Sequence, residues 1–307
     1  MPEADKRIKG LMLAICAIVL IIGWHSLSSS TPAAGSGQEW AVSDQGIVKY
    51  SIGTPQYNIS QTREDGNSTV SLVQFDSRGT LMEGLLRVPH LPHSKTTENK
   101  SSGIDETINR PIAGIVLLPG ATVTKEKEQG LARRLADLGY ASIALDQRNL
   151  GGINPQADLQ LFLKGVEPTE HRMIYDALAA AEILRLQPEI DPQRIIYAGE
   201  SNGGRFAIIA CALDPASRGV LAISTCGYGT DAAIASAGGN LDKDTARFYR
   251  SIDPDCYLNQ ISPRPLAMIH SRNDTVIAYD LAENTYILGL QPKSLHTVGC
   301  RVHGYCS

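Results

Sequence analysis

The stretch IDPQRIIYAGESNGG (190–204) decides the fold, because it combines a buried strand, a tight turn and the start of a helix. The turn carries G-x-S-x-G at 199–203, and an apolar helical pattern runs from Gly203 to Leu213. On a strand–turn–helix such a serine is held on a sharp bend, and its flanking glycines are needed because larger residues would clash. The pattern predicts an exposed nucleophile at Ser201. A glycine-rich turn with a capping serine is the structural alternative.

Buried strands alternate with amphipathic helices on both sides of this stretch. The predicted strands are Ile112–Leu118, Tyr140–Leu145, Arg194–Ala198, Val220–Thr225, Pro265–His270 and Leu295–Val298. The predicted helices are one that contains Leu131, Leu135 and Leu138, then Thr169–Gln187, Gly203–Leu213 and about 278–288. Such alternation requires crossover connections. We therefore predict an α/β fold with a mostly parallel sheet flanked by helices.

Two further features modify this plan. Apolar segments at 69–75 and 81–88 flank the turn Asp76-Ser77-Arg78-Gly79, which predicts an antiparallel hairpin at the N-terminal edge of the sheet. Residues 227–262 hold no clear strand and several glycines, so we expect a small lid-like insertion there.

Composition excludes some functions. The chain has 307 residues, 28 Lys and Arg against 32 Asp and Glu, and a net charge of -4. Nucleic-acid binding normally needs a basic surface, so no nucleic-acid partner is expected.

The amino terminus differs from the rest. Lys6, Arg7 and Lys9 precede an apolar run, which predicts a signal anchor or signal peptide over 1–27 and a membrane partner for an uncleaved segment. Residues 28–45 have the composition of a flexible tether, and 46–307 form the globular domain. Positive charge stays on the cytoplasmic side, so the domain is expected outside the cytoplasm, membrane-anchored or secreted.

An acid and a histidine follow the serine in the order that this architecture requires. Asp274 comes just after the strand at 265–270, and His303 lies past the last strand. Open α/β sheets place their sites at the carboxyl ends of strands. His296 is the competing histidine, but its place inside the last predicted strand fixes its side chain to one face of the sheet. Alone, Asp274 could be a solvated turn residue and His303 a tail residue.

These motifs resemble an α/β-hydrolase of the group that contains dienelactone hydrolases, acetyl xylan esterases and prolyl oligopeptidase catalytic domains. The resemblance covers about 70–307. It rests on LLPGA (117–121), LDQRNLGG (145–152), IDPQRIIYAGESNGG (190–204), HSRNDTVI (270–277) and HGY (303–305).

The resemblance implies a role for each site residue. Ser201 would be the nucleophile, His303 the general base and Asp274 its orienting carboxylate. The oxyanion donors would be the backbone amides of Asn202 and Ala121. No cofactor or metal is implied, and the substrate would be a small ester or a peptide.

Two departures from the family pattern remain. Serine stands in place of the cysteine of dienelactone hydrolases proper. Four residues follow His303 where the family usually adds a final helix, so we expect a short form or a truncated gene.

Several alternatives stay open. An esterase is favoured over a prolyl-oligopeptidase-type peptidase because no propeller-sized domain precedes the hydrolase region, and a non-catalytic binding protein of the same fold is the third reading. Cys300, His303 and Cys306 could form a metal site, although an exported protein favours a Cys300–Cys306 disulfide. His171 is expected at the surface. Arg148 is expected to line the site or to form a structural salt bridge.

Overall fold

The computed structural model describes residues 39–90, 111–301, 303 and 304. Strands β1 (Trp40–Val42) and β2 (Val48–Tyr50) form a two-stranded antiparallel sheet. The main sheet has nine strands in the order β11-β10-β9-β8-β6-β7-β5-β4-β3. They are β3 (Tyr57–Glu64), β4 (Ser68–Ser77), β5 (Thr80–Pro89), β6 (Ile112–Leu118), β7 (Ala141–Leu145), β8 (Ile190–Glu200), β9 (Val220–Ile223), β10 (Leu266–Ser271) and β11 (Lys293–Val298).

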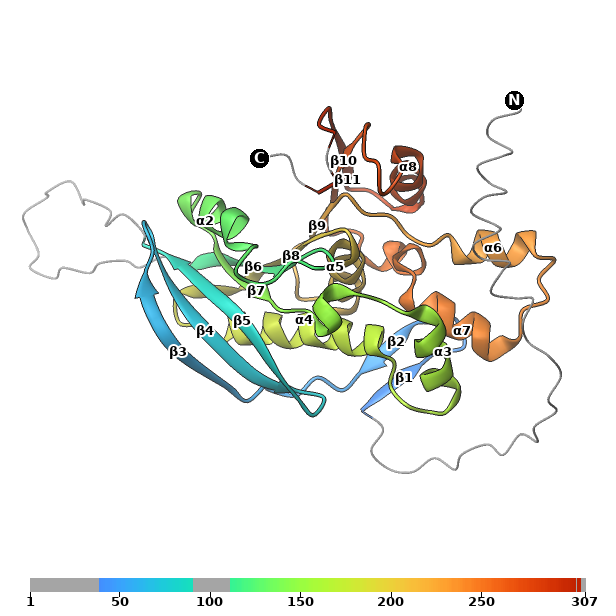
Figure 1. The fold of residues 1–307 in the computed structure, drawn as a ribbon, viewed down its shortest axis with the longest axis horizontal. Helices are drawn as coiled ribbons and strands as arrows, with labels where there is room; N and C mark the ends of the chain where they lie inside the picture. Colours follow the sequence, from blue (N-terminus) through green and yellow to red (C-terminus); the bar gives the residue numbers. More distant parts are fainter. Residues whose placement is uncertain (1–38, 91–110, 302, 305–307) are drawn as a thin grey trace, which may run out of the picture.

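The sheet is parallel from β7 through β6, β8, β9 and β10 to β11, and antiparallel at its β3–β5 end. Figure 1 shows this twisted antiparallel end opposite the end formed by β10 and β11. The predicted mostly parallel sheet with an antiparallel hairpin at its N-terminal side is confirmed. The hairpin turns at Arg78 and Gly79, whose φ angles of 53° and 70° suit a two-residue turn.

Helices cover both faces of the sheet. They are α2 (Gln129–Asp137), α3 (Pro155–Leu163), α4 (Thr169–Arg185), α5 (Asn202–Leu213), α6 (Thr230–Ser236), α7 (Lys243–Ile252) and α8 (Tyr279–Leu288), with short 3₁₀ turns η1 (Arg148–Gly151), η2 (Pro254–Cys256) and η3 (Leu258–Gln260). Alternate residues of β6 point to opposite faces. Val116 and Leu118 join a core with α4, α5 and α8, whereas Ile115 and Leu117 pack with α2.

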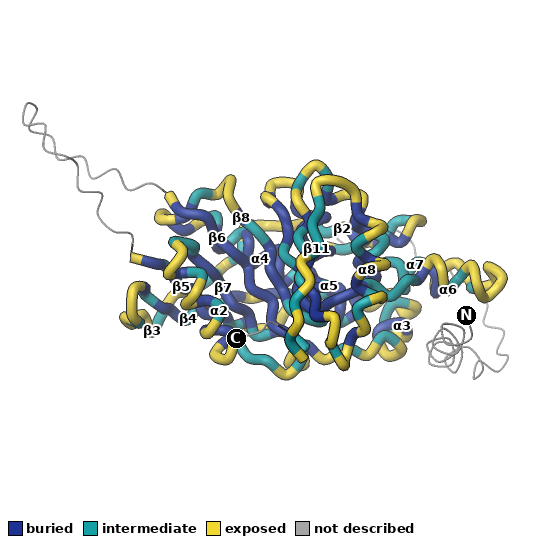
Figure 2. The backbone as a smooth tube through the Cα atoms, turned by 90° about the horizontal axis from the view of Figure 1, so that it is seen from above, coloured by how far each residue is buried: buried dark blue, intermediate teal, exposed yellow. Residues whose placement is uncertain are grey.

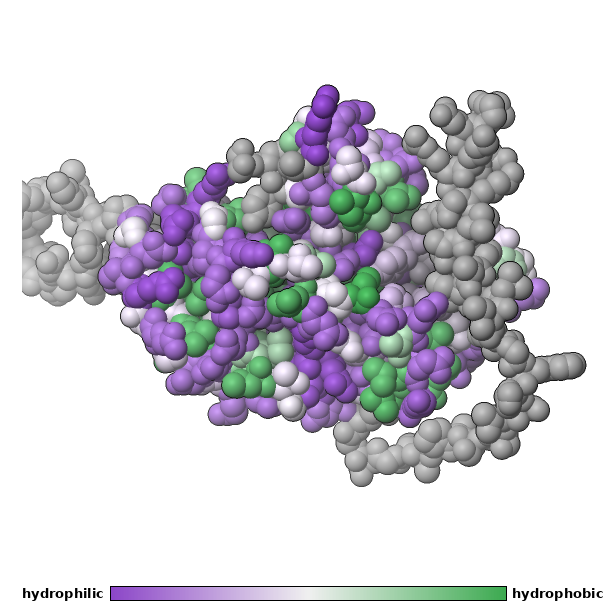
Figure 3. All heavy atoms as spheres, in the orientation of Figure 1, coloured by the Kyte–Doolittle hydropathy of each residue, from purple (hydrophilic) through white to green (hydrophobic). Residues whose placement is uncertain are grey.

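The buried core follows these layers. Figure 2 shows the central strands, α4 and α5 as mostly buried, with exposed residues along the loops and at the molecule's edges. The face of the molecule drawn in Figure 3 is mostly hydrophilic, and its apolar residues form small separate groups. The apolar side chains are therefore used mainly for packing the layers against the sheet.

The sequence patterns missed some elements. Helix α3 was not predicted, since it follows a loop with no clear periodicity. Strand β3 falls in a region where short strands are expected, but its largely polar faces gave it no predicted bounds. Residues 227–262 contain α6, α7 and two 3₁₀ turns, and they hold no strand, as expected. Leu138 ends the predicted helical face but lies beyond α2, where its side chain is exposed.

The amino-terminal predictions concern residues that the structure mostly leaves undescribed. The signal segment at 1–27 and most of the 28–45 tether lie outside the described residues. In the part of the chain that is described, no helix combines the length and the apolar character that crossing a membrane would need.

Helix α5 starts in very close contact with the end of β6. A Cβ atom on Gly203 would overlap the backbone carbonyl groups of Leu118 and Pro119, so no side chain fits at this position. Gly130 is the second residue of α2, as Gly203 is of α5, but a Cβ there would meet nothing within 4 Å.

We predict opposite effects of adding a methyl group at these two matched positions. Gly203→Ala should lower the free energy of unfolding by at least about 1–3 kcal/mol, because the backbone of α5 must move away from β6. Gly130→Ala should leave it unchanged or raise it by up to about 1 kcal/mol, because alanine favours the helix. Urea unfolding of both variants measures this. Equal effects would contradict the packing at Gly203.

The first turn of α4 buries two ionisable side chains. His171 is fully buried, so its expected surface position is wrong; the ring packs among the aromatic rings of Trp40, Phe162 and Phe248. Burial lowers the pKa of His171 to about 3. Burial, with Asp158 nearby, raises the pKa of Glu170 from 4.5 to about 8. Neither carboxyl oxygen of Glu170 has a hydrogen-bond partner.

We predict that Glu170 makes stability depend on pH. The unfolded chain releases the Glu170 proton near pH 4.5, whereas the folded protein keeps it until about pH 8. Folding therefore binds a proton in this window, and the stability of the wild type should fall as pH rises through it. Glu170→Gln stays neutral and should lose this dependence. Urea unfolding of both proteins at pH 5, 7 and 9 tests this, and a constant difference between them would contradict it.

Candidate active site

Ser201 lies on the sharp turn between β8 and α5, with φ 54° and ψ -120°. This left-handed conformation is strained for a residue with a side chain. Neighbouring glycines allow it: a Cβ on Gly199 would overlap Gly203, and one on Gly204 would lie 2.7 Å from the Thr225 side chain. The turn predicted from the glycine spacing is present, and Ser201 is half-buried at its tip.

The neighbouring strand β9 holds this turn in place. The Ser201 amide donates to the carbonyl oxygen of Ile223 at 2.9 Å. The hydroxyl of Thr225, two residues further on, donates to the Ser201 carbonyl oxygen at 2.7 Å. The backbone amide and carbonyl of Ser201 are thus both bonded to the end of β9, and these bonds leave its side chain free to rotate.

Asp274 follows β10 and its side chain is fully buried. Its Oδ1 accepts hydrogen bonds from the amides of Val276 and Ile277 at 2.8 and 2.9 Å. Burial alone would favour the neutral acid, but these amides and His303 outweigh it and hold the pKa of Asp274 below its usual range. The group is therefore a carboxylate at neutral pH.

His303 lies in the loop after β11, and its ring contacts Asp274. Nδ1 donates to Asp274 Oδ2 at 2.8 Å. The other ring nitrogen, Nε2, is shielded from solvent and has no hydrogen-bond partner among the described residues. The structure thus brings Asp274 and His303 together, while no hydrogen bond joins Nε2 to Ser201 Oγ. His296 lies within β11, as predicted, and its side chain is exposed.

Ser224 clamps the loop that carries His303. Its hydroxyl donates to the Gly304 carbonyl oxygen and accepts from the Gly304 amide, both at 3.0 Å. Ser224 is buried and has a positive φ of 46°, and its own amide is bonded to Ile269 of β10 at 2.8 Å. The end of β9 therefore contacts the serine turn through Thr225 and the histidine loop through Ser224.

The two predicted oxyanion donors lie on segments that meet beside Ser201. Asn202 is the first residue of α5, where helix amides lack intrahelical acceptors. Ala121 follows Gly120, and a Cβ on Gly120 would lie 3.4 Å from Ser201 Cβ. The Asn202 side chain donates to the Gly151 carbonyl oxygen at 3.0 Å, which joins η1 to this group.

Sequence reasoning missed three polar side chains near the site. His270, the last but one residue of β10, is fully buried, and its Nε2 lies 3.5 Å from Asp274 Oδ2 and 2.9 Å from the Ile277 carbonyl oxygen. Arg205 binds Asn202 Oδ1 at 2.7 Å. Ser224 is the third. His270 could have been found from its place four residues before Asp274, but the other two depend on how loops pack.

The remaining predicted residues have structural roles. Arg148 was expected either to line the site or to form a structural salt bridge. It forms a salt bridge with Asp176 at 2.7 Å. Cys300 is disulfide-bonded, and Cys211, Cys226 and Cys256 are free. Cys306 lies outside the described residues. A disulfide at Cys300 leaves no thiolate there to bind a metal, and the described residues contain no group of three or more potential metal ligands.

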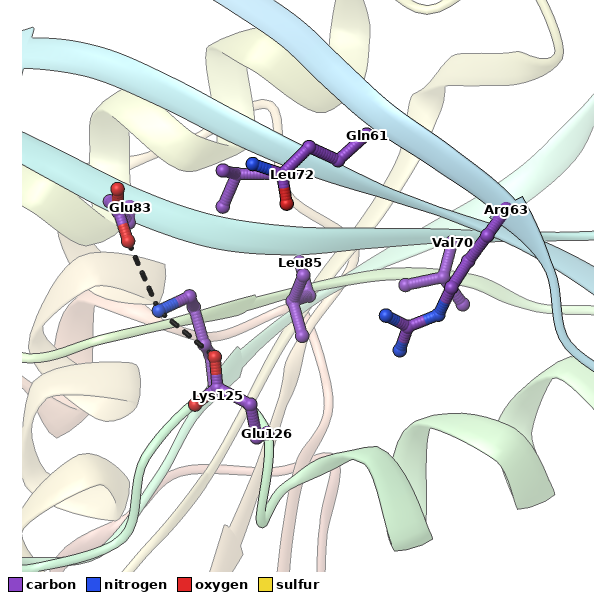
Figure 4. A pocket seen from close by; sticks show the side chains of 8 residues that line it. All are labelled: Gln61, Arg63, Val70, Leu72, Glu83, Leu85, Lys125 and Glu126. Carbon is purple, nitrogen blue, oxygen red and sulfur yellow. Dashed lines mark ion pairs between the residues drawn. The ribbon is translucent and has the colours of Figure 1, made fainter.

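A separate hollow of about 330 Å³ lies at the antiparallel end, between β3, β4, β5 and the loop before α2. Figure 4 shows Lys125 there, with its amine directed at Glu83 and Glu126. Those two carboxylates and Asp146 lie 3.2, 3.1 and 2.5 Å from the amine. Burial opposes the charge, but the three carboxylates outweigh it and raise the pKa of Lys125. The ammonium is no nucleophile, so this hollow is not the candidate catalytic site.

Comparison with known proteins agrees with this architecture. Residues 137–266 match the acetyl xylan esterase (AXE1) family. The uncharacterized protein YfhR of Escherichia coli O157:H7 is 31% identical over 133 residues, which are 42% of this chain and 44% of YfhR. The chain therefore spans less than half the length of this curated relative.

Two solved acetyl xylan esterases share the fold. The enzyme from Paenibacillus sp. R4 aligns with a TM-score of 0.60 at 17% identity, and acetyl xylan esterase 1 from Thermoanaerobacterium sp. JW/SL YS485 aligns with 0.59 at 15%. Each alignment covers 82% of this chain and 84% of the other. The chain thus shares the fold of these esterases, and its segment 137–266 is similar to the acetyl xylan esterase family.

Proposed function

We propose that the protein is a serine hydrolase that cleaves carboxylic esters through an acyl-enzyme. The observation that carries the proposal is the His303–Asp274 hydrogen bond of 2.8 Å, made by loops that follow β11 and β10, beside the strained turn of Ser201 at the end of β8. In this proposal Ser201 is the nucleophile, His303 the general base and Asp274 the carboxylate that orients the ring.

The reaction begins with neutral His303. Its Nδ1 proton is held by Asp274, so Nε2 carries the lone pair that accepts the Ser201 proton. Nε2 lacks a partner, and the Ser201–His303 contact forms when the substrate binds, as is common for sites that tighten in the complex. The serine oxygen attacks the ester carbonyl, and protonated His303 then gives its proton to the departing alcohol. Water activated by the same ring releases the acid.

The amides of Asn202 and Ala121 would stabilise the oxyanion. A well-placed donor of this kind lowers the barrier by about 2.7–4 kcal/mol. Arg205 and Gly151 hold the Asn202 side chain from two sides, at 2.7 and 3.0 Å, which fixes the first turn of α5 that supplies one donor.

The names of similar proteins suggest esters of carbohydrates as substrates. The AXE1 match over residues 137–266 supports acetyl esters, and a glucuronoyl esterase from Solibacter usitatus shares the fold with a TM-score of 0.56 at 13% identity. Release of acetate from acetylated xylan, compared with cleavage of p-nitrophenyl acyl esters and aminoacyl amides, separates this substrate class from a peptidase.

We predict that Ser201→Ala abolishes covalent labelling by a fluorophosphonate and lowers ester turnover by several orders of magnitude. The fold should persist, because alanine fits wherever serine fits at this turn. Intact mass and circular dichroism of wild type and variant check both points. Labelling that persists in the variant would identify another nucleophile. A wild type that is not labelled at all would favour a non-catalytic binding protein of this fold.

The two histidines near the carboxyl terminus should behave differently. His303→Ala should remove nearly all activity, because His303 makes the hydrogen bond with Asp274, whereas the other ring near Asp274, His270, is bonded to the Ile277 carbonyl oxygen. His296→Ala should cost at most stability, because its exposed ring lies within β11. Steady-state kinetics of both variants tests this, and an essential His296 with a dispensable His303 would overturn the assignment. Wild-type activity should also fall on acidification, since a protonated imidazole accepts no proton.

We also propose that the domain lies outside the cytoplasm. The basic residues Lys6, Arg7 and Lys9, followed by an apolar run within the segment 1–27, support a signal anchor or a cleaved signal. Added protease should then digest the domain on intact cells. Protection of the domain until the membrane is opened would contradict this location.

A further inference from the structure

Glu200 precedes the nucleophile, and its side chain lies between the two loops that flank Ser201. A Cβ on Gly304, the residue after His303, would overlap Glu200 Oε1. A Cβ on Gly120, before Ala121, would lie 3.6 Å from the same oxygen. The carboxyl group therefore lies between the histidine loop and the proposed oxyanion loop, and the glycines on both sides leave room for it.

No described residue neutralises this carboxyl group through a hydrogen bond or a salt bridge. Glu200 is only half-buried. Its charged neighbours are His303, from the loop after β11, and Asp274, from the loop after β10. Burial and Asp274 raise the pKa of Glu200, while His303 opposes the rise. Glu200, Asp274 and His303 thus lie close enough together to influence one another electrostatically.

We propose that Glu200 selects substrates by charge: it favours esters that carry a cationic group beside the scissile bond and disfavours esters that carry an anionic one. The inference rests on the proposed ester hydrolysis. An unpaired carboxylate beside the reaction centre attracts a cation and repels an anion most strongly where little water screens it. Asp274 contributes less to this selection, because its charge is buried and bonded to two amides and His303.

Three acetate esters with the same acyl group test the proposal. They are 2-(trimethylammonio)ethyl acetate, its neutral isostere 3,3-dimethylbutyl acetate, and the anionic ester acetoxyacetate. All three give the same acetyl-enzyme, so differences in kcat/KM report on the acylation step. Acetate release is measured above the pH at which Glu200 loses its proton, as shown by a pH profile of the cationic-to-neutral ratio.

The decisive variant is Glu200→Gln, which keeps the shape and removes the charge. Its matched control is Glu189→Gln, because Glu189 is exposed and precedes the opposite end of the same strand, β8. We expect the cationic-to-neutral ratio of kcat/KM to fall about tenfold in Glu200→Gln and the anionic-to-neutral ratio to rise by a similar factor, with both ratios unchanged in the control. In the wild type, the cationic preference should weaken as acidification protonates Glu200.

Labelling by a neutral fluorophosphonate distinguishes a failure of the charge selection by Glu200 from a failure of the proposed hydrolase function. Ratios that stay the same in Glu200→Gln while labelling persists would overturn the charge selection and leave the hydrolase intact. A wild type that is neither labelled nor active would overturn the proposed function itself. If the acetates are cleaved too slowly, rates of inactivation are measured instead. The two inhibitors are a phosphonate with a trimethylammonioethylthio leaving group and its neutral isostere. The ratio of their inactivation rates should fall in Glu200→Gln as the ratio of kcat/KM does.

Discussion

The site depends on how the loop after β11 reaches back across the sheet. β11 lies three strands from β8 in the sheet order, so roughly 14 Å separates their ends. Five residues lead from the end of β11 to His303, and they can span at most about 17 Å. The Ser224 hydroxyl bonds this loop just past His303, at both the amide and the carbonyl of Gly304. The clamp at the end of β9 therefore holds the backbone of the residue that follows His303, while Asp274 binds the His303 ring.

The same strand end also serves the nucleophile turn. Ile223 and Thr225 bond the backbone of Ser201, so its strained φ is fixed by the sheet and by the close contact of Gly203 with the end of β6. Rigid backbone contacts position Ser201, while His303 Nε2 remains available for the hydroxyl proton.

The sequence predicted the parts of this arrangement that follow from periodicity and spacing. Strands are visible as apolar runs and the serine turn as a glycine pattern, so Ser201, Asp274 and His303 could be placed at strand ends. Ser224 and the setting of Glu200 could not be predicted, because they depend on the path of a loop from a distant strand. His171 was wrongly expected at the surface. Helix α4 is buried on nearly every side, and the polar character of one residue does not indicate this burial.

The central claim is that Ser224 positions His303 for the proposed reaction, and Ser224→Ala tests it most directly. The control is Ser217→Ala, since Ser217 is also buried but bonds the Asp214 carbonyl oxygen away from the site. We predict that Ser224→Ala lowers kcat for p-nitrophenyl acetate by about 10²-fold with little change in KM, as expected for a misplaced base, whereas Ser217→Ala keeps the wild-type kcat. Wild-type kcat in a folded Ser224→Ala protein would contradict the account.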